Sequence, residues 1–179
     1  AIDALANDLR IKTAVSVVHL AFWAPLAQRL RSAHGWKIQY DCMDDWVGFP
    51  GIGQTLLEEE HTLVRDADLV TVTAALLQEK WAPMSRNCLL LRNGVDFEFF
   101  DRNCVPNALM AEIERPLIGF YGALAEWVDL ALIASIAQLR PDWNFVLIGD
   151  IFVKDLTGLD RLPYVHLLGR KPYAQMPLY

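Results

Sequence analysis

The amino-acid sequence predicts an α/β protein with two Rossmann-like units, each built on a parallel sheet. Short apolar runs rich in β-prone residues alternate with stretches of helical periodicity, and repeated βα units place parallel strands under covering helices. The alternation breaks down between residues 97 and 116, where prolines, asparagines and mixed charge follow no period. It restarts at residue 117, so we expect the crossing between two domains in this stretch.

The first unit is expected to contain a short opening helix and then strands that alternate with helices. Pro25 suits the first turn of the helix after the first strand, and Gly35 suits the position just past its end. The acid-rich helix before the third strand carries Glu58, Glu59 and Glu60, which we interpret as a solvated face. Strands are predicted at 13–20, 37–42, 68–74 and 88–96, the last ending in a turn, with helices at 23–34, 54–67 and 75–84.

The second unit begins with the run Leu-Ile-Gly-Phe-Tyr at 117–121, which is typical of a strand buried on both faces. Gly122 ends this strand, and a long apolar helix follows at 129–140 and stops at Pro141. The free N–H groups and positive dipole end at such a turn suit a phosphate, although a plain tight βα connection explains the same pattern. Further strands are predicted at 144–149 and 164–169, and a helix is expected to begin at Pro172.

Composition and charge argue against several classes of protein. The sequence is 54% hydrophobic and 21% charged, as in well-buried globular domains. A net charge of −6 argues against a nucleic-acid partner. No apolar run reaches about 18 residues and the first residues lack a signal layout, so we expect neither a membrane span nor a secretory signal. Cys42, Cys88 and Cys104 are widely spaced and indicate neither a metal site nor a disulfide framework, so we expect a reduced, cytoplasmic protein.

The strand ends of the first unit supply candidate catalytic residues, because ligands of parallel α/β sheets lie outside the carboxyl ends of the strands. His19 could hydrogen-bond an acceptor or could be structural. Asp44 and Asp45 could orient an acceptor hydroxyl or take its proton, or they could form an Asx turn or a helix cap. Asn93 and Gly94, at the end of the fourth strand, are further candidate residues for binding the nucleotide ligand, and the pair is interpreted as a turn in which glycine supplies a positive φ.

The strand ends of the second unit supply candidate binding residues, namely Gly122, Ala123, Gly149, Arg170 and Lys171. Glycines at strand ends let a ligand approach the backbone closely. Arg170 and Lys171 could face a ligand, or they could serve only surface solubility.

Six phrases follow one another along the chain: "IQYDCMDDW", "EEEHTLVRDADLVTVTA", "LLLRNGVDFEFF", "IGFYGALAEWVD", "WNFVLIGD" and "VHLLGRKPYAQMP". This ordered series resembles the bacterial retaining glycosyltransferases of the large group 1 family, and it covers about residues 13–179. The version with Tyr-Asp-Cys-Met-Asp-Asp and Gly-Ala-Leu-Ala-Glu-Trp-Val-Asp is similar to the branch that builds cell-surface polysaccharides.

The resemblance implies a GT-B fold with a partial acceptor-side domain at 1–105 and a partial nucleotide-sugar-binding domain at 114–179. It implies a retaining, hexosyltransferase-type enzyme that uses a nucleotide-diphosphate sugar, a glycan or lipid-linked acceptor, and neither metal nor other cofactor. The resemblance further implies that Gly122 and Ala123 let the diphosphate approach the start of the helix, and that the loop at Arg170 and Lys171 contacts the nucleotide. It allows peripheral association of the whole protein with the inner face of the membrane.

The sequence departs from the family pattern in two places. Family members usually carry an arginine and a lysine after the glycine turn, whereas the loop at 123–127 contains no cation. The paired glutamates of the family's donor motif do not occur within these residues. We therefore expect a fragment that is inactive by itself, and one that dimerises or swaps elements because its sheets have unpaired edges.

Other functions stay open at this point. A non-hydrolysing nucleotide-sugar 2-epimerase shares the two-domain fold, although the ordered phrases fit it less well. A catalytically inactive interaction module would result if the donor-binding residues had been lost. An NAD-dependent dehydrogenase is disfavoured, since the glycines of "GFPGIG" at 48–53 are in the wrong order for the dinucleotide fingerprint.

Overall fold

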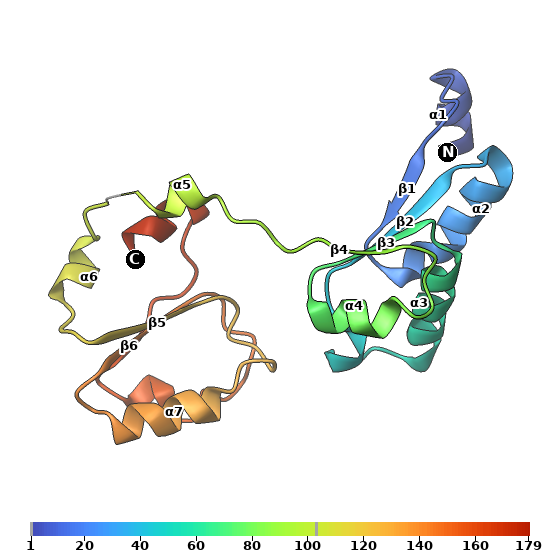
Figure 1. Cartoon of the computed structure of the whole chain (residues 1–179). Helices are drawn as coiled ribbons and strands as arrows, with labels where there is room; N and C mark the ends of the chain where they lie inside the picture. The colour runs from blue at the N-terminus through green and yellow to red at the C-terminus, as the bar shows by residue number, and fades with distance from the viewer. Residues whose placement is uncertain (1, 103) are drawn as a thin grey trace. The chain divides into compact units, whose positions relative to one another are not determined.

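The computed structural model describes residues 2–102 and 104–179 and shows two compact units, one up to Gly94 and the other from Val95 to Tyr179 (Figure 1). Each unit has its own parallel sheet and its own hydrophobic core, so the predicted α/β class with two sheets is confirmed. The division falls earlier than the break expected at 97–116, because the short helices within that stretch pack on the second unit.

The first sheet contains four parallel strands in the order β1-β2-β3-β4. They are β1 (Val15–Val18), β2 (Lys37–Cys42), β3 (Leu69–Val72) and β4 (Cys88–Leu90). The helices of this unit are α1 (Ile2–Asp8), α2 (Ala24–His34), α3 (Gln54–Asp66) and α4 (Ala75–Trp81), with short 3-10 helices at η1 (Ala21–Trp23) and η2 (Trp46–Gly48). The strands follow one another across the sheet in the same order as along the chain. Right-handed crossovers between successive parallel strands therefore bring α2, α3 and α4 to one face of the sheet (Figure 1).

The two faces of this sheet differ in burial. On the covered face, Ile38, Tyr40 and Val70 are almost completely buried. On the other face, Val17 in β1 and Leu89 in β4 are each 51% exposed. The register explains this alternation, because residues paired between parallel strands point to the same side of the sheet.

The end of α2 follows the sequence prediction. Pro25 lies in the first turn, and Gly35 follows the helix in the left-handed conformation with φ of 70°. The Gly35 N–H donates to the carbonyl oxygen of Arg31 at 2.8 Å. Glycine suits this position because a side chain in the left-handed region is strained.

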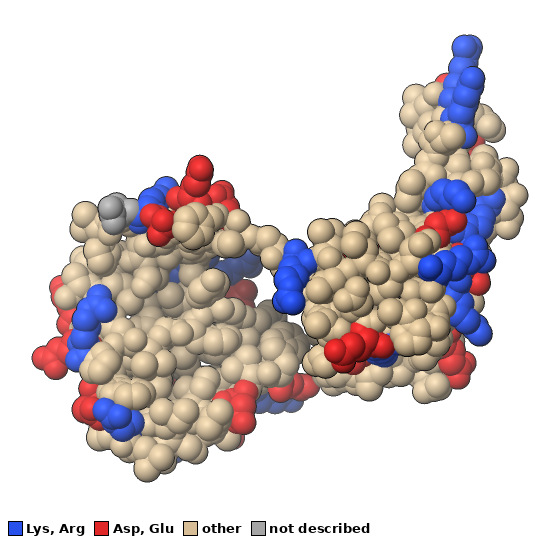
Figure 2. All heavy atoms as spheres, viewed as in Figure 1, with Lys and Arg blue, Asp and Glu red and all other residues tan. Residues whose placement is uncertain are grey.

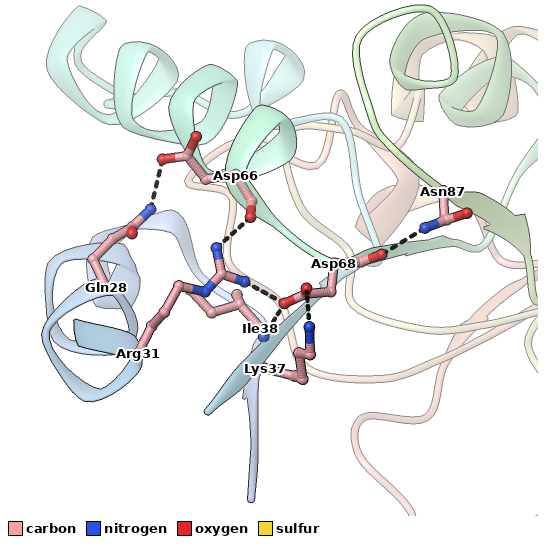
Figure 3. Close-up of polar contacts among 7 residues, drawn as sticks. All are labelled: Gln28, Arg31, Lys37, Ile38, Asp66, Asp68 and Asn87. Carbon is pink, nitrogen blue, oxygen red and sulfur yellow. Dashed lines mark hydrogen bonds and ion pairs between the residues drawn. The ribbon is translucent and has the colours of Figure 1, made fainter. Parts of the chain in front are cut away.

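The amino ends of the strands are held together by the carboxylate of Asp68, which immediately precedes β3 (Figure 3). It accepts hydrogen bonds from the Ile38 N–H at 2.9 Å and from Lys37 Nζ at 3.1 Å, both in β2, and it also contacts the guanidinium of Arg31 in α2. The Ile38 N–H in particular, together with Lys37 and Arg31, lowers the pKa of Asp68 below its usual value. The carbonyl oxygen of Asp68 accepts from the Asn87 amide at 2.9 Å, which ties in the residue before β4.

The ends of α2 and α3 join the same network. Arg31 Nη1 donates to the carbonyl oxygen of Asp66 at 2.6 Å, and Gln28 Nε2 donates to the Asp66 carboxylate at 2.7 Å (Figure 3). Two helices and three strand starts are therefore fixed relative to one another at this end of the sheet. The opposite end of the sheet, at the carboxyl ends of the strands, is formed by loops, and ligands of parallel sheets bind at that end.

The interpretation of Glu60 as part of a solvated helix face is wrong. Its side chain is 1% exposed and accepts a hydrogen bond from the Tyr40 hydroxyl at 2.5 Å. Leu56 and Val64 lie four residues before and after Glu60, so all three share the side of α3 that faces the sheet. Burial raises the pKa of Glu60, and it raises that of the neighbouring Cys42 thiol to about 11.

The second sheet contains three parallel strands in the order β5-β6-β7. They are β5 (Leu117–Tyr121), β6 (Asn144–Ile148) and β7 (Val165–Leu167), with helices α5 (Phe97–Phe100), α6 (Ala108–Glu112) and α7 (Leu130–Leu139) and 3-10 helices at η3 (Leu159–Arg161) and η4 (Tyr173–Leu178). The expectation that 117–121 is buried on both faces is wrong, since β5 is an edge strand and Tyr121 is 68% exposed. The buried strand is the central β6, in which Phe145, Val146 and Leu147 are at most 3% exposed.

The two faces of the second sheet are covered differently. On one face, Leu130 and Ala134 of α7 pack with Leu147 and Leu159. On the other face, Met110 of α6 packs with Val146 and Ile148, and Met176 and Tyr179 border this cluster. The rings of Phe99 in α5 and Tyr173 in η4 stack with centroids 4.9 Å apart, so the segment after Val95 belongs to this unit. The helix expected at Pro172 is the 3-10 helix η4.

Candidate functional site

The carboxyl ends of the strands in the second unit border a hollow of about 320 Å³. Its lining brings together five of the predicted binding residues, which come from separate loops: Gly122, Ala123, Gly149, Arg170 and Lys171. Asp150 adds a carboxylate to the same lining. The hollow therefore combines glycine backbone with charges of both signs at the place where parallel sheets bind ligands.

A larger hollow of about 430 Å³ adjoins this site, since Tyr121, Ile148 and Met176 line both. Its remaining lining is mainly apolar and comes from α6, η4 and the sheet face. Ligand orientation depends on a few placed polar groups, which the smaller hollow has and the larger one mostly lacks. We therefore assign the candidate site to the smaller hollow.

Gly122 and Gly149 lie unusually close together at the tips of β5 and β6. Both have φ of 150°, in the region that favours glycine. A Cβ atom added to Gly149 would lie 1.8 Å from the carbonyl oxygen of Gly122, a distance that no side chain tolerates. The Gly122 N–H also donates to the Ile148 carbonyl at 2.9 Å, which closes the two strand ends against each other.

The two cations at the tip of β7 make only loose contacts. Arg170 Nη1 lies 3.7 Å from the Asp150 carboxylate, and the Arg170 side chain is 80% exposed. Lys171 Nζ lies 5.8 Å from the ring centroid of Tyr179. An exposed pair of this kind is worth little, so both cations are accessible to an anion.

The approach of an anion to the start of α7 is obstructed by a side chain of the protein. The helix begins at Leu130, and the Asp129 carboxylate caps it by accepting from the Leu132 N–H at 2.8 Å. Leu124 and Ala125, in the loop after the glycine turn, are at most 2% exposed. An anion in the hollow would therefore meet the glycine turns and the β7 cations in place of the helix start.

His19 follows β1 in the first unit and is 53% exposed. Its Nδ1 atom lies 3.1 Å from the Asp41 carboxylate, in β2. The sequence interpretation did not select Asp41. The available signal was alternation: Tyr40 and Cys42 point into the core, so Asp41 between them must point to the open face.

Asp44 and Asp45 differ in their surroundings although they are neighbours. Asp45 caps η2 by accepting from the Val47 N–H, and it pairs with Lys80 Nζ at 2.7 Å. The hydrogen bond from Lys80 lowers the pKa of Asp45, which makes it a poor proton acceptor. Asp44 is exposed, and no other described residue forms a hydrogen bond or ion pair with its carboxylate. Of the pair, only Asp44 is available to a ligand.

The interpretation of Gly94 as a turn residue with positive φ is wrong. Gly94 is not among the glycines with positive φ, and the chain after β4 runs on without a turn from residue 91 to 96. Asn93 and Gly94 are exposed and belong to the first unit, so they do not line the hollow of the second unit.

The surface and the titratable groups give little sign of other kinds of site. On the face drawn in Figure 2, basic and acidic side chains are interspersed. Within 2–102 and 104–179, no three His, Cys, Asp or Glu side chains come together as metal ligands would. No helix in the same residues is long and apolar enough to cross a membrane.

The chain consists of two α/β units, each with a parallel sheet and with polar or glycine-rich strand ends, as the GT-B class of fold does. No family model matches the sequence. The chain is 26% identical over 172 residues to a Bacillus subtilis protein named as a teichuronic acid biosynthesis glycosyltransferase, TuaH, and the match covers 84% of this chain and 43% of that protein.

Solved glycosyltransferase structures show the same fold. The Anabaena protein HepE, crystallised with UDP and glucose, has a TM-score of 0.71 at 19% identity and covers 92% of this chain. Sucrose-phosphate synthase of Thermosynechococcus elongatus has a TM-score of 0.73 at 17% identity and covers 100%. The chain spans 49% and 50% of these two structures, respectively. It is thus a homologue of a glycosyltransferase and has the GT-B fold, as the resemblance predicted.

Proposed function

We propose that this chain forms part of a glycosyltransferase that transfers a sugar from a nucleotide-sugar to a hydroxyl acceptor in cell-surface polysaccharide synthesis. The observation that supports it most is the hollow of the second unit, where glycine turns and two accessible cations converge. The homologue TuaH supports the polysaccharide branch by its name. Retention at the anomeric carbon and the hexosyltransferase type rest on the sequence resemblance.

In this proposal the second unit binds the donor. The glycine backbone at Gly122 and Gly149 lets the diphosphate come close, and Arg170 and Lys171 meet its charge. The HepE structure with UDP and glucose supports a uridine nucleotide as the first ligand to try. Donor binding without a resident metal is part of the proposal, and it predicts equal UDP affinity with and without a chelator.

The first unit binds the acceptor in this proposal. His19 and Asp44 are the accessible polar side chains at its strand ends and would hydrogen-bond an acceptor hydroxyl. Asp45 is instead assigned to the loop structure, because it caps η2 and pairs with Lys80. A glycan or a lipid-linked sugar offers the hydroxyl group that the proposal needs.

The test is release of UDP from UDP-glucose, measured for the 179-residue chain and for the same chain extended to its full reading frame. We expect transfer by the extended chain only, and a loss of activity in Arg170→Ala but not in the matched Arg140→Ala. Arg140 is an exposed arginine remote from the hollow, paired with Asp142.

An inactive interaction module is the second candidate, and the cation-free loop at 123–127 favours it. An extended chain that neither binds UDP nor turns over any nucleotide-sugar would support the inactive module and contradict the enzyme.

A further inference from the structure

Four polar side chains on the open face of the first sheet form a continuous line of polar contacts, two of them hydrogen bonds and the third a close approach of a histidine to a carboxylate. Gln39 Nε2 donates to Thr71 Oγ1 at 3.2 Å, and Thr71 Oγ1 donates to Asp41 Oδ1 at 2.7 Å. Asp41 Oδ2 lies 3.1 Å from His19 Nδ1. The register places Asp41 of β2 directly beside Thr71 of β3, so both side chains point to the same face.

Chemistry constrains which partner supplies the proton in the two contacts of the Asp41 carboxylate. An ionised carboxylate can only accept, and the threonine hydroxyl has one proton to give. At 2.7 Å Asp41 Oδ1 is a nearer acceptor for the Thr71 proton than the Tyr40 carbonyl oxygen at 3.4 Å, and the other Asp41 oxygen faces His19 Nδ1 at 3.1 Å. A carboxylate opposite Nδ1 favours the tautomer in which this atom carries the hydrogen, and in the neutral ring that tautomer leaves the lone pair on Nε2.

Burial decreases along the line from Thr71 outward to His19. Thr71 is 2% exposed, the Asp41 side chain 26% and the His19 side chain 53%. The inner end is fixed by strand pairing, because Thr71 and Gln39 are both residues of the sheet. The imidazole is thus held through one ring nitrogen while the rest of the ring faces solvent.

We propose that Asp41 is a positioning residue, which fixes His19 in the Nδ1–H tautomer so that Nε2 accepts a hydrogen bond from a sugar hydroxyl. The role of Nε2 toward a sugar rests on the proposed function, whereas the tautomer does not. Thr71 holds the Asp41 carboxylate in the orientation that this requires. A free histidine side chain favours the Nε2–H tautomer, which would offer a donor where the acceptor hydroxyl also has to donate.

A second histidine of the chain, His34, serves as an internal reference for the tautomer of His19. His34 contacts the Asp3 carboxylate through Nε2 at 2.9 Å, and the same reasoning gives it the opposite tautomer, Nε2–H. His34 packs against Trp36, away from the strand ends that carry the candidate site. A measurement that reports both histidines at once therefore distinguishes a local effect at His19 from a general one.

The test is ring ¹⁵N NMR of the 179-residue chain at about pH 8.5, where an ordinary imidazole is neutral. The four histidines make the spectrum tractable, and His19→Gln assigns the signal. We expect Nδ1–H at His19 and Nε2–H at His34.

The Asp41→Asn variant should change the His19 tautomer to Nε2–H, because Thr71 donates to the amide oxygen and the amide NH₂ then faces Nδ1. Asp41→Ala should also give Nε2–H, whereas Asp3→Ala should leave His19 unchanged. A wild-type His19 in the Nε2–H form, or no change in both Asp41 variants, would overturn the proposal.

Kinetics of the extended chain separate this inference from the proposed function. General acid–base contacts contribute about 10²–10⁴-fold to a rate, so Asp41→Ala should lower kcat about tenfold or more. His19→Ala should lower kcat too, and the double variant should be no slower than His19→Ala alone. An unchanged kcat in Asp41→Ala overturns the positioning role. No transfer by the wild type, together with the expected tautomers, contradicts the proposed function and leaves the tautomer assignment supported.

Discussion

At the carboxyl ends of their strands, the first unit presents side chains that hold one another, whereas the second presents glycine backbone and loosely held cations. In the first unit His19 is bound by Asp41, and Asp45 is bound by Lys80. In the second, Gly149 lies against the carbonyl of Gly122, and Arg170 is 80% exposed. The difference suits a division of labour, in which oriented side chains meet a hydroxyl group and open backbone admits a bulky anion.

The largest effect is expected where the second unit depends on glycine. Gly149→Ala places a Cβ atom 1.8 Å from the Gly122 carbonyl oxygen at a φ of 150°, so the strand tips must separate. We expect a loss of about 3 kcal/mol or more in the stability of the second unit. Amide hydrogen exchange in β6 measures it, with exchange in β3 as the reference for the first unit.

Gly119→Ala is the matched control, because a Cβ atom there meets nothing within 4 Å and its φ is not positive. This variant should stay within about 0.5 kcal/mol of the wild type. If Gly149→Ala were equally mild, the close approach of the strand tips would not be a requirement of the fold.

The second effect concerns the amino end of the first sheet, which is fastened by Asp68. Asp68→Asn removes the charge that accepts from Ile38, Lys37 and Arg31, and we expect a loss of about 2 kcal/mol, by urea unfolding. The pKa of Asp68 is lowered in the folded state, so its ionised carboxylate stabilises the folded protein at any pH above the unfolded-chain pKa of about 3.9. This stabilisation is lost as the pH falls through the folded-state pKa.

Asp142→Asn is the control for this variant, since Asp142 pairs with Arg140 two residues away on the surface. Its stability should not change measurably. Equal effects of the two substitutions would show that the Asp68 network does not hold the sheet.

A smaller effect of opposite sign is expected at Glu60. Its raised pKa means that the folded protein keeps a proton that the unfolded chain releases above about pH 4.3, so stability falls as the pH rises until the folded-state pKa is passed. Glu60→Gln keeps the acceptor for Tyr40 and cannot ionise. It should stabilise the protein by about 1 kcal/mol at pH 8 and flatten the pH dependence.

Glu58→Gln provides the comparison for Glu60→Gln, because Glu58 lies in the same turn of α3 and is exposed. We expect no stabilisation there. A stabilisation by Glu60→Gln that is the same at pH 4 and pH 8 would contradict a raised pKa of the buried Glu60 carboxyl.

The smallest effect is weak association through the edges of the sheets. β1 is an edge strand, and its Val17 side chain is 51% exposed on the open face. Light scattering should show concentration-dependent dimers, and Val17→Lys should reduce them, since charge on an edge strand opposes pairing. Monomers at the highest soluble concentration would contradict this expectation.

Most of the fold could be predicted from the sequence, because the βα alternation and the glycines and prolines that end helices and strands are visible in short stretches of sequence. The end of α2 at Gly35 and the start of the second sheet at Leu117 follow from such signals. Burial was harder to predict, since it depends on neighbours that local patterns do not specify. The run at 117–121 is as apolar as a central strand but lies at an edge. Glu60 is a charged residue type, but it occupies a position on the buried side of α3.

The candidate site could be predicted in part for the same reason. Residues at strand ends are found from the strands alone, and the structure brings Gly122, Gly149 and Arg170 together. Partnerships between distant side chains left no local signal. The pairing of Asp45 with Lys80 and the contact of Asp41 with His19 both depend on the three-dimensional register of the strands and helices.

The division of labour between the two units is tested most directly by titrating the ¹⁵N-labelled 179-residue chain with UDP. Two exposed cations contribute about 0.2–1 kcal/mol each, well below the roughly 4 kcal/mol of a 1 mM complex, so the Kd should be weaker than about 1 mM. We predict chemical-shift changes at Gly122, Gly149 and Arg170 that Arg170→Ala diminishes, and none at His19. Shifts centred on His19, or none at the strand tips of the second unit at any soluble UDP concentration, would contradict the account.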